Sequence, residues 1–208
     1  MVTFNQPQLE QEAIKSVEEH TEFPHKLTVY DNWEKKEWIG KVWNDLIRKS
    51  DCEYICLLNS DVVVEDGWLT DLMETFDWDK DIAIVGPSTN SCGSEQKVPR
   101  KYAKENRGKW MDGSLLSGFC LLFKKEVWDL VNGFDEDFEL YGQDSFFVWM
   151  VQRGGYKTVW NKGAWVFHHG RSSILKAEKN GLYNTDEQSR KAQEIFDSKV
   201  QDCINRSS

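Results

Sequence analysis

The sequence predicts an α/β domain, with a mostly parallel, mixed sheet flanked by helices and followed by a C-terminal helical extension. Apolar runs of strand length alternate with segments whose apolar residues recur at helical spacing, which is typical of this class. Polar residues follow directly after two strand-like runs, as they do where parallel strands end beside a ligand. A chain of 208 residues, 39% of them apolar, is long enough to bury one sizeable core.

The first half of the chain is expected to alternate strands with helices. Asn5 can serve as the N-cap of the first helix, with Pro7 in its first turn. The expected strands are residues 1–4, 26–30, 54–58 and 82–85. The inward positions of the three helices are Leu9, Ala13 and Val17, then Ile39, Val42, Trp43, Leu46 and Ile47, then Trp68, Leu69, Leu72, Met73 and Phe76.

The second half continues this alternation after a long polar segment. Residues 87–110 are polar and basic, which predicts a long loop of the kind that can close over a donor or an acceptor. Thr185 and Gln188 predict a capping box for the last helix. Strands are expected at residues 119–123, 157–160 and 165–167, and helices at residues 127–131, at 144–154 and after Thr185, the last with Ala192, Ile195, Phe196, Val200 and Cys203 inward.

Charge and composition argue against several classes of protein. A surplus of Asp and Glu gives a net charge of −9, so a nucleic-acid binder with a basic face is not expected. No stretch approaches ~18 consecutive apolar residues, so no transmembrane segment is expected. The polar N-terminus does not resemble a signal peptide, and five Cys without a C-x-x-C pair suit reduced thiols in a cytoplasmic protein.

The first candidate site follows the apolar run at residues 54–58, in the sequence LLNSDVVVEDGWL. Asn59 and Asp61 stand where this strand ends, which is where open α/β sheets bind ligands. Hard oxygen ligands such as this carboxylate suit Mg²⁺ or Mn²⁺, which could bridge to a diphosphate. The alternative is that Asp61 caps the next turn.

A second carboxylate, Asp31, also stands at the end of a predicted strand. It could accept a hydrogen bond from a nucleobase N–H or from ribose hydroxyls. The alternative is a local Asx turn, in which the side chain bonds its own backbone.

Asp144 lies in an acid-rich segment, GFDEDFELYGQDSFF, most of whose acids suit a solvated face. It follows Gly142 at a predicted helix start and has aromatic neighbours, so the helix terminus favours its charged form and the apolar surroundings disfavour it. Such a group can act as a general base toward an acceptor hydroxyl. The alternative is a helix N-cap.

Two adjacent His, His168 and His169, follow a predicted strand in VFHHGRSS. A neutral imidazole there can complete a metal site, and Arg171 could bind a diphosphate through its planar fork. The alternative is a surface pair of His. Among the ten Trp, three fall on amphipathic helix faces and are expected in the core, and three others are candidate ligand contacts. The core set is Trp43, Trp68 and Trp128, and the contact set is Trp33, Trp38 and Trp110.

In combination, these motifs resemble the glycosyltransferase family 2 proteins of GT-A fold, in particular their rhamnosyltransferase-like branch. The resemblance covers residues 2–173. VTFNQPQ resembles the end of the family's first strand, TVYDN its base-recognition strand, and KVWND, with Asn44, the helix before its metal strand. LLNSDVV resembles the D-x-D-type motif, GSLLSGFCLLFKKEVWDLVNGFDEDF the acceptor-side block, ELYGQDSFF the G-E-D segment and VFHHGRSS the His segment.

The resemblance implies transfer of a sugar, with inversion, from a nucleotide-diphosphate-sugar to a glycan or another hydroxyl acceptor. Mn²⁺ or Mg²⁺ would be held by Asp61 together with His168 or His169, and Asp144 would be the base. Asp31, Asn44, Asn59 and Arg171 would belong to the nucleotide-sugar site. A Rossmann-like GT-A catalytic domain would span residues 1–173, with its first strand truncated, and residues 174–208 would form the helical extension.

Three departures from the family pattern keep alternatives open. Gln143 replaces a usual Glu, Phe146 replaces a frequent second Asp, and most of the first strand is missing. A catalytically silent relative that binds nucleotide or glycan is therefore one alternative. A sugar-nucleotide pyrophosphorylase is another, although no G-x-G-x-x-G loop lies near the N-terminus. Peripheral membrane contact through a lipid-linked acceptor also stays open.

Overall fold

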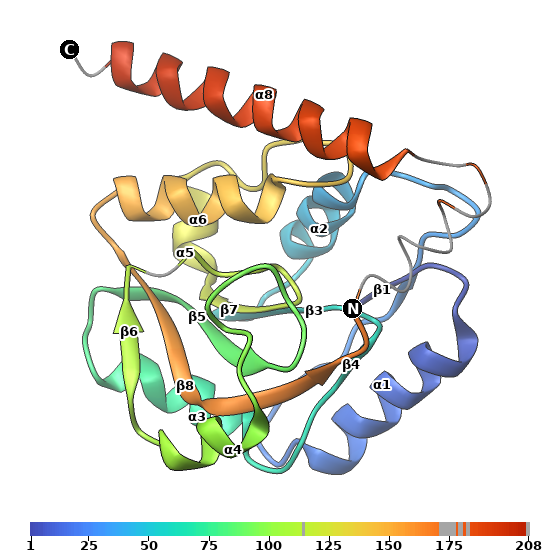
Figure 1. The fold of residues 1–208 in the computed structure, drawn as a ribbon, viewed down its shortest axis with the longest axis vertical. Coiled ribbons are helices and arrows are strands. Elements are labelled where there is room, and N and C mark those ends of the chain that lie inside the picture. Colours follow the sequence, from blue (N-terminus) through green and yellow to red (C-terminus); the bar gives the residue numbers. More distant parts are fainter. Residues whose placement is uncertain (114, 171–177, 179–180, 182–183, 207–208) are drawn as a thin grey trace.

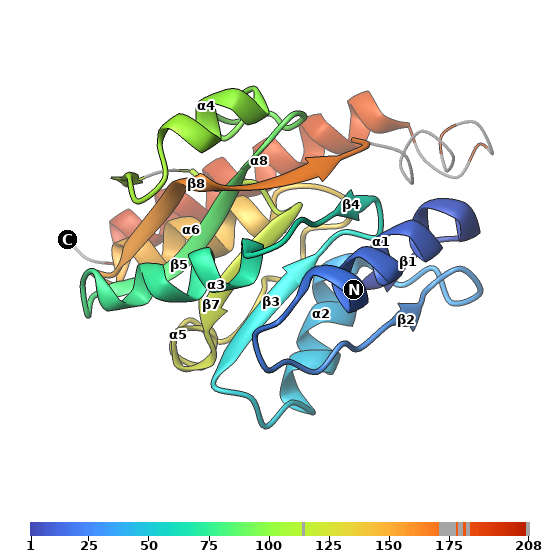
Figure 2. The ribbon, with the colours of Figure 1, turned by 90° about the horizontal axis from the view of Figure 1, so that it is seen from below.

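The computed structural model of the chain describes residues 1–113, 115–170, 178, 181 and 184–206. A central sheet runs through the molecule, and helices cover both of its faces (Figures 1 and 2). The last helix lies across one side of the molecule, next to the helix that precedes the final strand (Figure 1). The predicted α/β class, with a mixed sheet flanked by helices, is confirmed.

The sheet contains strands that run in two directions. In spatial order its strands are β3 (Tyr54–Leu58), β7 (Cys120–Lys124), β5 (Ile82–Thr89), β8 (Lys157–His168) and β4 (Val62–Val63), with β6 (Trp110–Asp112) also paired to β8. A parallel pair, β1 (Val2–Thr3) and β2 (Tyr30–Asp31), joins the end of β3 through a bridge between Val2 and Asn59. The pairings orient β1, β2, β3, β5 and β8 one way and β4, β6 and β7 the other.

Helices pack on the two faces of the sheet through separate apolar clusters. The helices are α1 (Pro7–His20), α2 (Ile39–Arg48), α3 (Trp68–Glu74) with the 3₁₀ turn η1 (Thr75–Asp77), α4 (Arg100–Glu105), α5 (Lys125–Leu130), α6 (Gln143–Arg153) and α8 (Thr185–Asn205). One face is covered by α1 and α3, and the other by α2, α5 and α6. The three Trp predicted in the core, Trp43, Trp68 and Trp128, are all buried.

The polar segment 87–110 is not the long loop predicted from the sequence. β5 extends to Thr89 with all of its residues buried, because β8 continues beside it as far as Val166. Ser88 is accommodated there because its hydroxyl accepts the Trp160 Nε1–H at 2.9 Å and donates to a backbone carbonyl. The same segment then forms α4, which packs against β8 through a stack of Tyr102 on Trp160.

Other boundaries also differ from the predictions. The N-cap position of α1 is Gln6 and not Asn5, and the carboxylate of Glu10 accepts the Gln6 amide at 2.7 Å. The N-cap of α8 is Asn184, whose side chain accepts the Glu187 amide at 3.1 Å, one residue before the predicted capping box. The two predicted strands at residues 157–167 form one continuous strand, β8, and β2 is shorter and later than predicted. In each case a tertiary pairing or a competing side chain decided the boundary.

The side chain of Asn44, on α2, fixes the segment between α5 and α6. Its Nδ2 donates to the carbonyl of Phe134 and to Oε1 of Glu136, both at 2.8 Å. Its Oδ1 accepts the Phe134 amide at 2.8 Å and the Trp128 indole at 3.2 Å. Asn44 is 1% exposed, so water could not replace these partners.

Asn44→Ala is expected to lower the free energy of unfolding by ~2–4 kcal/mol, because several buried polar groups would lose their partner. Urea denaturation followed by Trp fluorescence measures this. The control is Asn205→Ala at an exposed helix end, which should change stability by less than about 0.5 kcal/mol. A similar small effect for Asn44→Ala would contradict its role as an anchor.

Candidate active site

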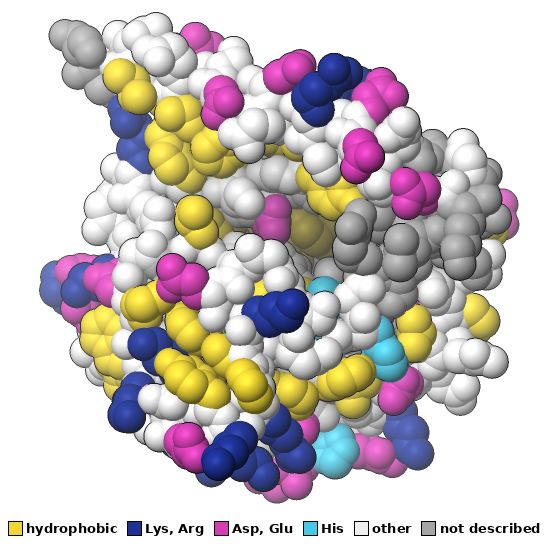
Figure 3. Space-filling model, in the orientation of Figure 1, with side chains coloured by type: hydrophobic (Ala, Val, Ile, Leu, Met, Phe, Trp, Pro, Cys, Tyr) yellow, Lys and Arg dark blue, Asp and Glu magenta, His cyan; other side chains and the backbone are white. Residues whose placement is uncertain are grey.

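A cleft of about 500 Å³ lies at the ends of β1, β3 and β8, beside the N-terminus of α6. Figure 3 shows this hollow below α8, with acidic and hydrophobic side chains inside it. The turn after β3, the end of β8 and the start of α6 each contribute polar side chains. These polar side chains are Asn59, Ser60, Asp61, Gln143, Asp144 and His168.

Asp61 and His168 meet in this cleft because β4 pairs with the end of β8. The register sets Val62 opposite His168 and brings Nε2 of His168 to 3.2 Å from Oδ1 of Asp61. The side chains of Asp61 and His168 are only 8% and 10% exposed. The pair therefore joins the turn after β3 to the end of β8 at a buried position in the cleft.

The ring of His168 is oriented by its other contacts. Nδ1 lies 2.6 Å from the carbonyl oxygen of Ser91, so Nδ1 carries a proton and donates it. Burial lowers the pKa of His168, but Asp61 and the Ser91 carbonyl raise it by more, and the net pKa lies above its ordinary value. Nε2 therefore faces Asp61 and can hold either a proton or a metal ion.

The side chain of His169 points away from the cleft, although the backbone of His169 supports the cleft. Its amide donates to the carbonyl of Asp61 at 3.0 Å, and its Nε2 lies 3.2 Å from Oε2 of Glu12 on α1. Successive side chains of an extended chain face opposite sides. Of the two His left open by the sequence, His168 is therefore the one that lines the cleft.

Asp61 and His168 form a donor set that fits a divalent metal ion. The pair combines carboxylate oxygen, which suits Mg²⁺ and Mn²⁺, with an imidazole nitrogen, a ligand common to many divalent metals. The described residues contain no group of three or more His, Cys, Asp or Glu that could hold an ion by themselves. In nucleotide sites, such ions complete their coordination with phosphate oxygens and water. Two protein ligands therefore suit a metal that binds together with a diphosphate.

Asp144 lies in the first turn of α6, whose N-cap is Gly142, so the alternative that Asp144 is the N-cap is wrong. Its Oδ2 accepts the Gly118 amide at 2.7 Å. Burial raises the pKa of Asp144 above its ordinary value of 3.8, although backbone amide hydrogen bonds partly oppose this shift. The result is a carboxylate with a fixed direction and raised basicity, which is what a general base requires.

The turn at residues 117–119 connects Asp144 to the pair of Asp61 and His168. The Gly118 amide holds Asp144, and the Phe119 carbonyl accepts the Asn59 amide at 2.9 Å. The Phe119 ring stacks on His168 with 5.3 Å between ring centroids. Gly118 is required because a Cβ on it would lie 2.7 Å from Oδ2 of Asp144. Gly118 carries no signal in the sequence that predicts this role, since the role depends on a long-range contact.

Two predicted nucleotide contacts lie outside the cleft lining. Asp31 is exposed at the end of β2, and its carboxylate accepts the Trp33 amide at 2.9 Å, which is the Asx turn left open by the sequence. The next residue, Asn32, lines the cleft instead, because side chains alternate along the strand. The side-chain amide of Asn44 makes its hydrogen bonds within the core. Its role is therefore to anchor the 134–136 segment and not to contact a nucleotide. Arg171 lies outside the described residues.

Of the three Trp predicted as ligand contacts, only Trp38 lines the cleft. Trp33 packs edge-to-face against Phe4, and Trp110 stacks on Trp78 with 6.1 Å between ring centroids. From the predicted loop 87–110, only Cys92 and Gly93 reach the cleft. Closure of that segment over a substrate stays a prediction.

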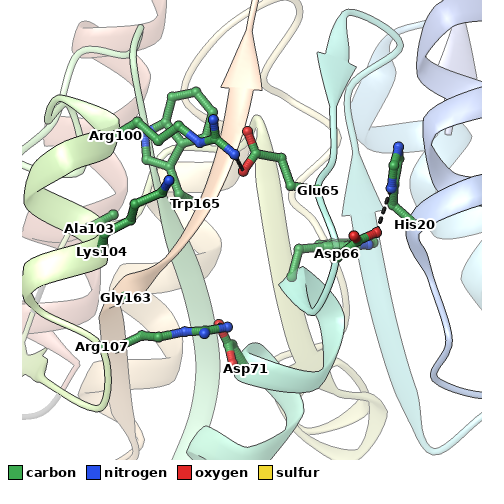
Figure 4. A pocket seen from close by; sticks show the side chains of 11 residues that line it. His20, Glu65, Asp66, Asp71, Arg100, Ala103, Lys104, Arg107, Gly163 and Trp165 are labelled. Atoms are coloured by element: carbon green, nitrogen blue, oxygen red, sulfur yellow. Dashed lines mark hydrogen bonds and ion pairs between the residues drawn. The ribbon is translucent and has the colours of Figure 1, made fainter.

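A second hollow, of about 490 Å³, lies between α4 and the start of α3 (Figure 4). Basic side chains of α4 face acidic side chains across it. Arg100 pairs with Glu65, and Arg107 with Asp71 at 3.2 Å. These ion pairs connect α4 and the turn that follows it to the opposite wall, and the predicted site residues that the structure describes do not line this hollow.

Comparison with known proteins identifies the family of the chain. A family model described as Glycosyl transferase family 2 matches residues 3–131. This match is to the family as a whole and does not distinguish the rhamnosyltransferase-like branch. A search of curated proteins found no significant match.

Two solved structures show the same fold at low identity. The chain is similar to the mannosyltransferase PcManGT from Pyrobaculum calidifontis in complex with GDP-Man and Mn²⁺, at 15% identity and a TM-score of 0.61, over 80% of this chain and 55% of that one. It is also similar to GalNAc-T7 with UDP, GalNAc and Mn²⁺, at 13% identity and a TM-score of 0.62, over 80% and 42% of the two chains. The chain thus spans about half the length of each.

The family assignment follows from the extent of the sequence match. Residues 3–131 are more than half of the chain and include the turn with Asp61, whereas Asp144 and His168 lie beyond the matched range. The solved structures add the GT-A fold over most of the chain. The chain belongs to glycosyl transferase family 2.

Proposed function

We propose that the chain is a metal-dependent, inverting glycosyltransferase that moves a sugar from a nucleotide-diphosphate-sugar to a hydroxyl acceptor. The observation that carries this proposal is that Asp61, His168 and Asp144 line one cleft. The first two fit a divalent metal, and the third fits a general base. The family assignment supports the reaction class, and the similar structures contain GDP-Man or UDP with Mn²⁺.

The charge of the cleft supports the metal requirement. Its described lining residues include the carboxylates of Glu37, Asp61, Glu139 and Asp144, and they include no Lys or Arg. A diphosphate would be repelled by such a lining at close range. Bound Mn²⁺ or Mg²⁺ would offset this repulsion and the charge that develops on the leaving diphosphate.

Asp144 is proposed as the base of the transfer. Its carboxylate takes the proton of the acceptor hydroxyl while the acceptor oxygen bonds to the anomeric carbon. The bond from that carbon to the diphosphate oxygen breaks on the opposite side, which inverts the configuration. The Gly118 amide fixes the direction of the carboxylate, and burial increases its affinity for the proton.

Other cleft residues support donor binding. Asn59 lines the cleft two residues before Asp61, where its amide can contact a ribose hydroxyl or a metal-bound water. We further propose that residues 1–173 form the catalytic domain and residues 174–208 its helical extension. The five Cys are all free, which supports a reducing compartment such as the cytoplasm. Among the described residues, no helix has both the length and the apolarity to cross a bilayer.

One observation favours a second candidate, a catalytically silent nucleotide- or glycan-binding protein. Gln143 is neutral where the family pattern usually has Glu. Within the described part of the chain, its Oε1 is buried without a hydrogen-bond partner. Such an acceptor can receive a donor from a bound ligand without any chemistry following. The first experiment below separates the two candidates.

Asp144→Asn should lower the rate of nucleoside diphosphate release from a panel of nucleotide-diphosphate-sugars with Mn²⁺ by about 10²–10⁴-fold, because it removes the base. Calorimetric affinity for the nucleoside diphosphate should stay the same. The control is Asp202→Asn at an exposed position of α8, which should keep full activity. If wild type and Asp144→Asn are equally inert across the panel, the silent candidate is favoured.

Asp144→Asn should also show how much stability the protein loses by burying the Asp144 carboxylate. The pKa of Asp144 is raised in the folded state, so the unfolded chain loses the Asp144 proton at a lower pH than the folded chain does. The stability of wild type therefore falls as the pH rises from about 4 through the folded-state pKa. Asn does not ionise. The melting temperature of Asp144→Asn should therefore exceed that of wild type at about pH 8, with a difference that shrinks toward pH 4. A difference independent of pH would contradict this assignment.

Asp61→Ala should remove the effect of metal on nucleotide binding. Calorimetry with a nucleoside diphosphate should show Mn²⁺ tightening the binding to wild type by on the order of tenfold or more, since the ion offsets repulsion within the cleft. The control is Asp66→Ala, which removes an exposed carboxylate outside the cleft and should keep the effect. Metal-dependent tightening that persists in Asp61→Ala would exclude Asp61 as the ligand.

Gly118→Ala should displace Asp144, because the new Cβ would lie 2.7 Å from its Oδ2. A shift of about 1 Å in a base can lower kcat by roughly 10²-fold. The expected result is a large loss of kcat with nucleotide affinity retained. The control is Gly93→Ala, also in the cleft lining, where a Cβ meets nothing within 4 Å. Equal activity of both variants would contradict this account.

A further inference from the structure

The segment at residues 134–142, between α5 and α6, forms one wall of the cleft. It contributes Glu139, Leu140 and Tyr141 to the lining and leads directly into Gln143 and Asp144. Its start is held by Asn44, which bonds both backbone groups of Phe134. Within the described chain, the remainder of the segment also has contacts with α8, the helix that lies furthest from the sheet (Figure 1).

The strongest of these contacts are the ion pairs made by Lys199 on α8. Its Nζ lies 2.7 Å from Oδ2 of Asp135 and 2.6 Å from Oδ2 of Asp137. The side chains of Lys199 and Asp135 are only 25% and 24% exposed, so water screens this pair less than a surface pair. The carboxylates of Asp135 and Asp137 raise the pKa of Lys199 by more than burial lowers it. The ammonium therefore bridges two acids of one segment.

Apolar packing brings α8 and the segment together around the same point. Phe138 is fully buried, and its ring packs against Phe146 of α6 at 5.5 Å between centroids. Phe196 of α8 packs edge-to-face on that same Phe146 ring. Gly142 closes the segment at φ +93°, and a Cβ there would lie 2.7 Å from the Phe138 ring. The segment therefore has little room to shift while α8 is in place.

Other ion pairs of α8 are weaker by geometry. Lys191 lies 3.9 Å from Glu139, and Arg190 pairs with Glu194 of its own helix at 4.0 Å with both side chains more than 70% exposed. Exposed pairs at such distances contribute little to stability. Lys199 differs because removing it would leave the carboxylates of Asp135 and Asp137 facing one another without a cation.

We propose that Lys199 is a positioning residue for the transfer reaction: by bridging Asp135 and Asp137, it holds the 134–142 segment and so the base at its end. This inference rests on the proposed function. Lys199 touches neither the cleft lining nor the metal pair, so it acts through the segment alone. The C-terminal helix thereby becomes part of the catalytic apparatus.

The test compares Lys199→Met with Arg190→Met, which removes an equal charge from the same helix without touching the segment. Lys199→Met should lower kcat for donor turnover by about tenfold or more, with the KM for the donor within about twofold of wild type, because the base is displaced and the metal side is not. Arg190→Met should match wild type. Lys199→Arg should keep most of the activity.

A charge exchange tests whether the ion bridge itself is what turnover requires. Lys199→Glu alone should be at least as impaired as Lys199→Met, and adding Asp137→Lys should restore turnover because residue 137 then provides the cation between Asp135 and residue 199. Restoration would show that turnover requires the cation between these acids and not the lysine at position 199 as such. Equal kcat in Lys199→Met and wild type, or failure of the exchange to restore turnover, would overturn the proposal.

Hydrogen–deuterium exchange tests the bridge independently of whether the proposed function is correct. Backbone amides of residues 136–142 should lose protection in Lys199→Met and keep it in Arg190→Met. If wild type turns over no donor but this difference is seen, the proposed function fails and the bridge stands. If protection is unchanged in Lys199→Met, the bridge fails whatever the activity of wild type.

Discussion

The hydrogen bond from the Gly118 amide to Asp144 is the contact on which the cleft depends. Gly118 and Phe119 precede β7 in the middle of the sheet, and from there Gly118 holds Asp144 while Phe119 supports Asn59 and His168. A central strand is among the most rigid parts of a domain because its neighbours pair with it on both sides. The spacing between Asp144 and the Asp61–His168 pair is therefore set by covalent geometry within one turn.

The same arrangement places four carboxylates in one cleft, and the protein manages their charge in different ways. Asp61 is paired with His168, Glu37 lies 2.6 Å from Lys41, and Asp144 is given backbone amides in place of a cation. The backbone amides hold the Asp144 carboxylate in position, and burial raises its pKa by more than these hydrogen bonds lower it. This difference suits Asp61 to a metal and Asp144 to a proton.

The first half of the 134–142 segment is anchored from outside the sheet at two points. Asn44 satisfies the backbone of Phe134 from α2, and Lys199 bridges two acids from α8. The acidic run GFDEDFELYGQD, which has the composition of a solvated surface, is thus partly internal: Asp135 is half-buried, and Phe138 is fully buried between α6 and α8. The helix α8 therefore has a structural link to the cleft, whereas the family match ends before this helix.

The sequence alone determined the fold class, most of the helices and the strand-end positions of Asn59, Asp61 and His168, because these depend on local periodicity and on where apolar runs stop. The tertiary structure decided which neighbour in a polar pair faces inward: His168 and not His169, and Asn32 and not Asp31. It also gave Asn44 and Gly118 their roles, since their partners lie far away in sequence at Phe134 and Asp144. Periodicity records burial along one element, whereas such pairings depend on the register between elements, which a single sequence does not encode locally.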